Sequence, residues 1–118
     1  MINITLPYPP TVNTYWRFTN TGVYISAKGK HYKNDVKIRC MNSGFKSFSK
    51  DKRLKMFIVA HMSDKRRRDI DNVLKALLDA LSGMIYDDDS QVDDLQIVRG
   101  GLCPEGVGSV EINVSEMK

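Results

Sequence analysis

The sequence predicts a single α+β domain, residues 1–118, in which a four-stranded mixed sheet packs on two helices in the order β-α-β-α-β-β. Two observations favour this fold class. The composition is that of an ordinary globular chain, 42% hydrophobic and 27% charged over 118 residues, which suffices for one core. Stretches of alternating apolar residues are interleaved with two stretches in which apolar residues recur at helical spacing.

The first strand and a hairpin are predicted from local patterns. Residues 2–6 alternate apolar and polar side chains, and Pro7 cannot continue a strand ladder. Between residues 14 and 26, aromatic and β-branched side chains flank a turn sequence at 20–22. This arrangement is typical of a small β-hairpin.

The first long helix is expected from Ser26, a candidate N-cap, to about Asn42, with Gly44 as the stop signal. Its apolar residues recur loosely at helical spacing, and its outer side is basic. The cations on that side are Lys28, Lys30, Lys33, Lys37 and Arg39.

The connection that follows is polar and rich in lysine, but it carries Phe45 and Phe48. These rings either pin the loop to the core or wedge between stacked bases, as apolar residues of DNA-bending proteins do. Residues 54–62 then alternate, and Phe57 and Val59 lie on the second face of the strand. A strand with apolar residues on both faces is expected in the interior of a sheet.

The clearest element is a helix from Asp69 to about Gly83, with an aspartate at its start and a glycine where a C-terminal cap belongs. After an acidic stretch, residues 95–102 and 108–115 are predicted to form a hairpin through a turn at 104–106. The apolar stripe of the helix consists of Ile70, Val73, Leu74, Leu77, Leu78 and Leu81.

Charge is divided unevenly along the chain. Residues 1–68 contain 15 Lys and Arg against 3 Asp and Glu, whereas residues 69–118 contain 3 against 11. This division predicts a polyanion-binding surface in the first part and clustered carboxylates in the second. The alternative is two solvated faces that neutralise each other.

The most informative segment runs from Asp64 to Asn72, where four consecutive cations precede two aspartates spaced i, i+2. Like charges side by side cost stability unless a ligand compensates, whereas a stabilising helix pattern places opposite charges at i, i+4. Phosphate would satisfy the cations, and a divalent metal ion would satisfy the carboxylates. The alternative is a solvated loop with an aspartate that caps the helix.

Helix geometry limits how Asp69 and Asp71 can share an ion. Inside a regular helix they would point about 200° apart, so Asp69 has to stand at the cap. Two carboxylates alone make a weak site, and Asp87, Asp88 and Asp89 are the obvious source of a third. Oxygen ligands favour Mg²⁺, with Mn²⁺ as a substitute, over zinc.

Lys75 stands one turn after Asp71, on the same face of the helix. It could stabilise charge on phosphoryl oxygens or contact the DNA backbone. The alternative is a pair of plain i, i+4 ion pairs with Asp71 and Asp79. His31 and His61 have no nucleophile or acid at a suggestive spacing, and neither is expected to carry chemistry.

Other features exclude several classes of protein. The longest apolar stretch has five residues, far short of the roughly 20 that a membrane helix needs. Cys40 and Cys103 are too few for a metal cluster, and both are expected to be reduced thiols. Met1 leads directly into a strand pattern rather than into a secretory leader, so we expect a cytoplasmic protein with no membrane partner.

The motifs of this chain and the spacing between them resemble those of a known family over nearly the whole length of the sequence. A basic run, Asp-x-Asp-Asn, a lysine four residues on and a later Asp-Asp-x-Gln-Val form a specific combination. The strand and the Pro-rich opening at 6–13 add to it. The chain resembles the RusA family of Holliday junction resolvases, which bacteria, phages and prophages carry.

The resemblance implies a homodimeric endonuclease that cuts four-way DNA junctions with Mg²⁺. Carried over by position, it makes Asp69, Asp71 and Asp89 the metal-binding, catalytic carboxylates. It also implies that Lys75 is the catalytic lysine close to the active site. The DNA-contacting residues would be Lys65, Arg66, Arg67, Arg68 and Lys75.

One departure from the family pattern concerns the third carboxylate. This chain has three aspartates where the pattern shows two. Asp89 keeps the spacing to Gln91 and is therefore preferred, but Asp88 is not excluded.

We therefore predict a Mg²⁺-dependent endonuclease that resolves Holliday junctions by paired symmetric nicks in DNA recombination and repair. An activated water would attack the phosphorus in line and expel the 3′ oxygen, which leaves ends that a ligase can seal. Two alternatives remain open. One is a non-catalytic DNA-binding accessory protein of recombination, and the other is a nuclease that acts on other branched DNA.

Overall fold

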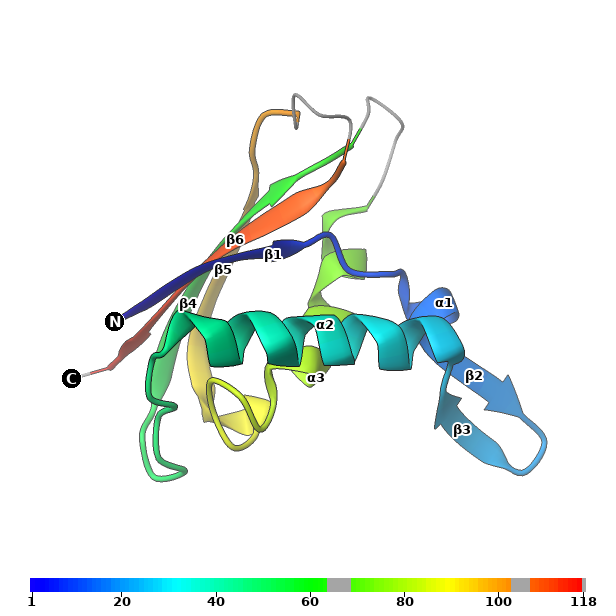
Figure 1. Cartoon of the computed structure of the whole chain (residues 1–118), viewed down its shortest axis with the longest axis horizontal. Coiled ribbons are helices and arrows are strands. Elements are labelled where there is room, and N and C mark those ends of the chain that lie inside the picture. Colours follow the sequence, from blue (N-terminus) through cyan, green and yellow to red (C-terminus); the bar gives the residue numbers. More distant parts are fainter. Residues whose placement is uncertain (64–68, 103–106, 118) are drawn as a thin grey trace.

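A computed structural model describes residues 1–63, 69–102 and 107–117 of the chain. Figure 1 shows its helices and strands. In chain order they are β1 (Ile2–Pro7), α1 (Val12–Tyr15), β2 (Trp16–Thr19), β3 (Gly22–Ile25), α2 (Ala27–Ser43), β4 (Leu54–His61), the 3-10 turn η1 (Ile70–Val73), α3 (Leu74–Leu81), the 3-10 turn η2 (Asp89–Gln91), β5 (Val92–Arg99) and β6 (Ser109–Glu116).

Four strands form one sheet in the order β1-β6-β4-β5, and β2 and β3 form a separate hairpin. β4 and β5 run parallel, whereas the other neighbouring strands run antiparallel, so the sheet is mixed. α2 and α3 pack against each other, and α2 also contacts β1 (Figure 1). The predicted fold class, a four-stranded mixed sheet packed on two helices, is confirmed. The predicted hairpin before α2 is also confirmed.

α2 begins and ends close to its predicted bounds. The Ser26 hydroxyl accepts a hydrogen bond from the Gly29 amide at 3.0 Å and caps the helix. Gly44 closes it in the left-handed conformation, with a φ of 72°. Cys40 is a free thiol on the buried side, where burial raises its pKa to about 11. Cys103 lies outside the described residues.

Successive side chains of β4 point to opposite faces of the sheet, and those on one face lie in the core. Leu54, Met56, Ile58 and Ala60 are buried, while Phe57 on the opposite face is 37% exposed. β4 has a neighbour on each side, which confirms the prediction of an interior strand.

Two predictions about the C-terminal half are wrong. β5 and β6 do not form a hairpin, because β4 lies between them and pairs with both. The turn predicted at 104–106 lies outside the described residues. β5 begins at Val92 rather than at residue 95, so Asp93 and Asp94 lie within a strand. Pairing with β4 overrides the low strand propensity of aspartate, and Asp93 forms an ion pair with Arg53.

No helix in the described part of the chain is both long enough and apolar enough to cross a membrane.

Candidate active site

The helix that carries the predicted catalytic residues begins as the 3-10 turn η1 and continues directly into α3, which ends at Leu81. The helix predicted from Asp69 to Gly83 is therefore shorter at both ends. Asp69 has an extended backbone, with φ −79° and ψ 129°, and stands at the cap position. That is the position it needs if it is to share an ion with Asp71.

The side chains of Asp69 and Asp71 form no ion pair with any other described residue. Both are exposed, and Asp69 makes no side-chain capping hydrogen bond. Neither carboxylate has an ion pair within the described residues. The alternative in which Asp69 merely caps the helix is therefore wrong. Two carboxylates at the start of η1 stay available to a ligand.

Lys75 is exposed on the same side of the helix as Asp71. The i, i+4 ion pairs expected as its alternative role are not found among the described residues. Asp79 instead accepts a hydrogen bond from the Tyr15 hydroxyl at 2.5 Å and lies 3.5 Å from the Lys33 ammonium. Lys75 is thus left free for an anionic ligand.

The contact between Tyr15 and Asp79 has no local signature in the sequence, because the two residues are 64 positions apart. Tyr15 is fully buried, and burial, with the hydrogen bond to Asp79, raises its pKa, so it stays a neutral donor. The contact joins α1 to α3 and holds the helix that carries Asp71 in place.

The aspartates that precede β5 differ in their role in the fold. Asp88 caps η2, because its carboxylate accepts a hydrogen bond from the Ser90 amide at 3.1 Å. Hydrogen bonds from Ser90 hold the pKa of Asp88 below its ordinary value. Asp89 is exposed, and its carboxylate has no hydrogen bond or ion pair among the described residues. Asp89 rather than Asp88 is therefore free for a ligand.

Gln91 fixes this turn from inside the protein. Its side chain is only 3% exposed. The carbonyl oxygen accepts hydrogen bonds from the amides of Asp87 and Asp88, at 2.8 and 3.1 Å. The side-chain amide donates to the carbonyls of Ser49 and Lys52, at 2.9 and 3.1 Å. The glutamine of the Asp-Asp-x-Gln-Val motif thus has a structural role, which is to tie η2 to the loop before β4.

Asp69 and Asp71 do not meet Asp89 within one chain. Because β4 and β5 are parallel, α3 has to run back along the sheet between them. Residues 70–81 span roughly 18 Å at 1.5 Å per residue. Figure 1 shows η1 at one end of α3 and the yellow η2 segment near the other. Among the described residues, no three His, Cys, Asp or Glu side chains are grouped so that they could hold a metal ion.

The donor chemistry of these carboxylates fits a hard divalent cation, but the described residues of one chain do not bring three of them together. Asp69 and Asp71 offer oxygen ligands at one point, and the third predicted carboxylate lies at the far end of the helix. The three-carboxylate site stays a prediction.

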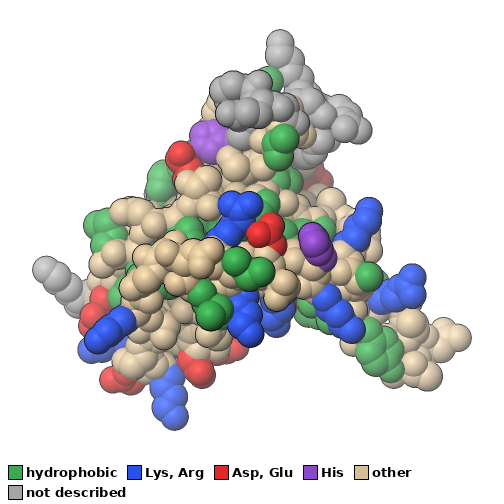
Figure 2. All heavy atoms as spheres, in the orientation of Figure 1, with side chains coloured by type: hydrophobic (Ala, Val, Ile, Leu, Met, Phe, Trp, Pro, Cys, Tyr) green, Lys and Arg blue, Asp and Glu red, His purple; other side chains and the backbone are tan. Residues whose placement is uncertain are grey.

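A basic surface formed by α2 faces outward. Lys28, Lys30 and Lys37 are exposed and have no carboxylate partner among the described residues. Figure 2 shows Lys and Arg side chains spread over this face of the molecule. Lys30 and Lys37 also line a shallow groove between α2 and the end of α3. The surface provides positive charge without any contribution from residues 64–68.

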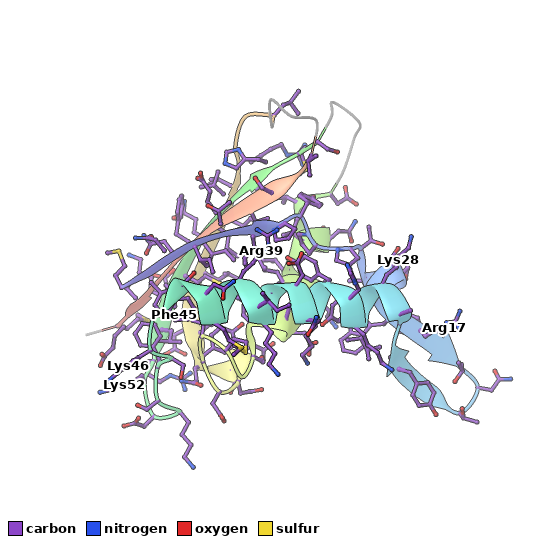
Figure 3. All side chains as sticks on the ribbon, viewed as in Figure 1. Arg17, Lys28, Arg39, Phe45, Lys46 and Lys52 are labelled. Carbon is purple, nitrogen blue, oxygen red and sulfur yellow. The ribbon has the colours of Figure 1, made fainter. Side chains whose placement is uncertain are left out.

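Further cations extend this surface along the molecule. Figure 3 shows Arg17, Lys28, Lys46 and Lys52 from β2 to the loop that follows α2. The predicted DNA-contacting residues Lys65, Arg66, Arg67 and Arg68 lie outside the described residues.

The two phenylalanines of the loop after α2 are partly buried and pack on the core. The amide of Phe48 also donates a hydrogen bond to the carbonyl of Ile85 at 2.8 Å. Of the two roles considered for Phe45 and Phe48, the structure favours the one in which they pin the loop to the core.

Comparison with known proteins identifies the family. The family model described as Endodeoxyribonuclease RusA matches residues 7–115. The chain belongs to the RusA family. The crossover junction endodeoxyribonuclease rusA of Enterobacteria phage HK97 is 42% identical over 112 residues, which cover 94% of this chain and 92% of that protein. The RusA protein of Escherichia coli strain K12, with the same description, is 35% identical over 116 residues, 98% of this chain and 94% of that protein.

Family membership confirms the resemblance and the class of enzyme that it implied, an endodeoxyribonuclease. RusA relatives occur in phages and in bacteria, and that of Shigella sonnei strain Ss046 is 36% identical over 98% of this chain. Asp69, Asp71 and Asp89 are among the carboxylates that have no ion pair with another described residue. They are also the three that the RusA resemblance makes catalytic.

Proposed function

We propose that this RusA-family protein is an endonuclease that resolves four-way DNA junctions by paired symmetric nicks. Mg²⁺ is the proposed cofactor, with Mn²⁺ as a substitute. The observation that carries the proposal is the match over residues 7–115 to a family whose relatives are described as crossover junction endodeoxyribonucleases. The proposed setting is recombination and repair in the cytoplasm of a bacterial cell, with a bacterial, phage or prophage gene as its source.

Asp69, Asp71 and Asp89 are the proposed metal-binding, catalytic carboxylates. Their availability supports this role, because each is exposed and has no partner among the described residues. Divalent cations such as Mg²⁺ prefer carboxylate oxygens. Lys75 would place a positive charge beside the scissile phosphate, where negative charge increases in the transition state.

The basic surface of α2 is proposed to hold the arms of the junction through phosphate contacts. Exposed Lys28, Lys30 and Lys37 lie there, and none of them has an ion pair with a described carboxylate. Lys65, Arg66, Arg67 and Arg68 would add contacts next to Asp69. Binding that depends on phosphate contacts releases counterions, so junction affinity should fall steeply as salt rises.

A homodimer is part of the proposal. A four-way junction is nearly two-fold symmetric, and resolution requires two cuts in strands of like polarity. A two-fold dimer presents two identical sites in a matching arrangement.

Cleavage assays with a labelled four-way junction, a flap and a linear duplex test the proposed function. With Mg²⁺ the protein should make paired, ligatable cuts in the junction, and EDTA should abolish them. Asp71→Asn should reduce cleavage by more than about 100-fold, since even partners of metal ligands contribute about 10- to 100-fold. Junction binding should persist in that variant.

Asp94→Asn is the matched control, because it makes the same chemical change at an exposed strand residue. It should cut at the wild-type rate. Wild-type protein that binds junctions and cuts no branched DNA would instead be an accessory binding protein. Stronger cutting of flaps than of junctions would indicate the other alternative, a nuclease of different specificity.

A further inference from the structure

The β2–β3 hairpin exposes a group of large apolar side chains, and it projects away from the four-stranded sheet (Figure 1). Phe18, Val23 and Tyr24 are 59%, 57% and 53% exposed. Phe18 and Val23 stand directly opposite each other on the two strands, so their side chains share one face of the hairpin. Single exposed apolar residues are ordinary, but three of them on one short hairpin form a patch that is typical of an interaction site.

The base of the hairpin is fixed to the body of the protein. Trp16 and Ile25 form the cross-strand pair at this base, and both pack against the core. The amide of Ser26 donates a hydrogen bond to the carbonyl of Tyr15 at 2.9 Å, and its hydroxyl donates to the carbonyl of Thr14. The exposed side chains therefore stand on an ordered support, which lowers the entropic cost of binding.

The charge around the hairpin favours a polyanion as its partner. Residues 1–34 contain 4 Lys and Arg and no Asp or Glu. Figure 3 shows Arg17 on the hairpin and Lys28 near the start of α2. Neither cation has an ion pair with a carboxylate in the described part of the chain. A second copy docked through the same patch would bring like charges together, which disfavours self-association there.

A hollow at the base of the hairpin combines an aromatic ring with these two cations. Its volume is about 530 Å³, and Trp16, Arg17 and Lys28 are among the residues that line it. The Trp16 ring makes an edge-on contact with the Tyr15 ring, with 4.9 Å between the ring centroids. Proteins that hold unpaired nucleic-acid strands combine cations for the phosphates with aromatic rings on which bases stack. The hairpin and its base provide both.

We propose that the β2–β3 hairpin binds unpaired bases of branched DNA. Phe18 and Tyr24 are the rings on which bases stack, and Arg17 and Lys28 contact the adjoining phosphates. The two rings lie on opposite faces of the hairpin, because Tyr24 pairs with Arg17 and side chains alternate along a strand. A ring on each face suits a point at which two strands separate. This inference rests on the proposed function and names the part of the substrate that the hairpin recognises.

Two single-stranded probes of equal length test the inference without any cleavage. One is a labelled oligothymidylate, and the other is the same backbone with abasic sites in place of the bases. Fluorescence anisotropy in EDTA measures both affinities. Wild type should bind the oligothymidylate at least about 5-fold more tightly, since stacking on one ring contributes about that much. Phe18→Ala combined with Tyr24→Ala should reduce this preference to less than about 2-fold and leave the affinity for the abasic strand unchanged.

Three further variants serve as controls, and thermal unfolding shows whether each keeps its fold. Phe18→Trp retains a flat ring and should keep the preference for bases. Met41→Ala removes an apolar side chain that is 65% exposed near the other end of α2, and it should also keep the preference. Arg17→Gln should weaken the binding of both probes equally and reduce the salt slope of log affinity by about 0.7.

Loss of the preference in the double alanine variant, with its retention in Phe18→Trp, supports the inference. An unchanged preference in the alanine variant, or equal binding of the two probes by wild type, would overturn it. So would a loss of self-association in sedimentation without a loss of the preference, which would make the patch a contact between copies.

The outcomes also separate this inference from the proposed function. If wild type cuts junctions and the alanine variant keeps the preference for bases, the role of the hairpin is wrong and the proposed function stands. If the preference depends on the two rings but no branched DNA is cut, the proposed function is wrong and binding by the hairpin stands.

Discussion

The two ends of α3 carry the same type of residue and use it differently. At the η2 end, Asp88 caps a turn, and Gln91 holds the backbone on both sides of it. At the η1 end, Asp69 occupies the cap position and caps nothing. A carboxylate that accepts hydrogen bonds in the folded chain has a structural role. A carboxylate that is exposed, has no partner among the described residues and follows a basic run in the sequence is available to a ligand.

The largest expected effect separates two neighbouring aspartates. Asp89→Asn should lower Mg²⁺-dependent junction cleavage by more than about 100-fold and leave the melting temperature unchanged. Asp88→Asn should keep cleavage within about 3-fold, because asparagine caps a helical turn as well as aspartate does. Cleavage rates and thermal unfolding of the two variants check the contrast. If both variants lost activity equally, the capping hydrogen bond of Asp88 would not predict which of the two carboxylates takes part in cleavage.

The next largest effect is a difference in the free energy of unfolding between substitutions at the η2 end and at the η1 end of α3. Gln91→Leu should lower the free energy of unfolding by roughly 3 kcal/mol or more, because it leaves four backbone groups around a buried side chain without their partners. Asn72→Ala, an exposed change at the η1 end, should stay within about 0.5 kcal/mol of wild type. Urea denaturation measures both values. A small loss for Gln91→Leu would contradict the role of this side chain in fixing η2.

The smallest expected effect concerns pH. The His61 ring donates a hydrogen bond to the Gly101 carbonyl at 2.9 Å and lies 3.4 Å from the Glu111 carboxylate. The bond to Gly101 and the nearby Glu111 raise the pKa of His61. Its stabilisation is therefore complete below the unfolded pKa of about 6.5 and is lost as the pH rises through the folded value.

His61→Gln should accordingly lower the melting temperature more at pH 5.5 than at pH 8. Asp71→Asn should not change how the melting temperature varies between these pH values, because no folded-state partner of Asp71 is described. Thermal unfolding of both variants at the two pH values measures these differences in melting temperature. A larger effect of His61→Gln at pH 8 would show that the sign of the pKa shift is wrong.

Local patterns predict the elements whose limits depend on neighbouring residues. Ser26 and Gly44 mark the ends of α2 because capping depends on backbone groups within one turn. Alternation from Leu54 onward identifies β4 and its buried face for a similar reason. The local pattern does not predict the start of β5, because pairing with a distant strand outweighs the low strand propensity of two aspartates.

The sequence by itself determined which charged groups the protein carries: a basic first part and carboxylates near both ends of one helix. It also determined the family to which this combination belongs. Only the tertiary structure decided which carboxylates are used by the fold and where the rest lie. Gln91 and Tyr15 donate hydrogen bonds to residues far away along the chain, and no local pattern encodes these contacts. The order of strands is also a long-range property. It places β4 between β5 and β6, and with a parallel β5 it sends Asp69 and Asp89 to opposite ends of α3.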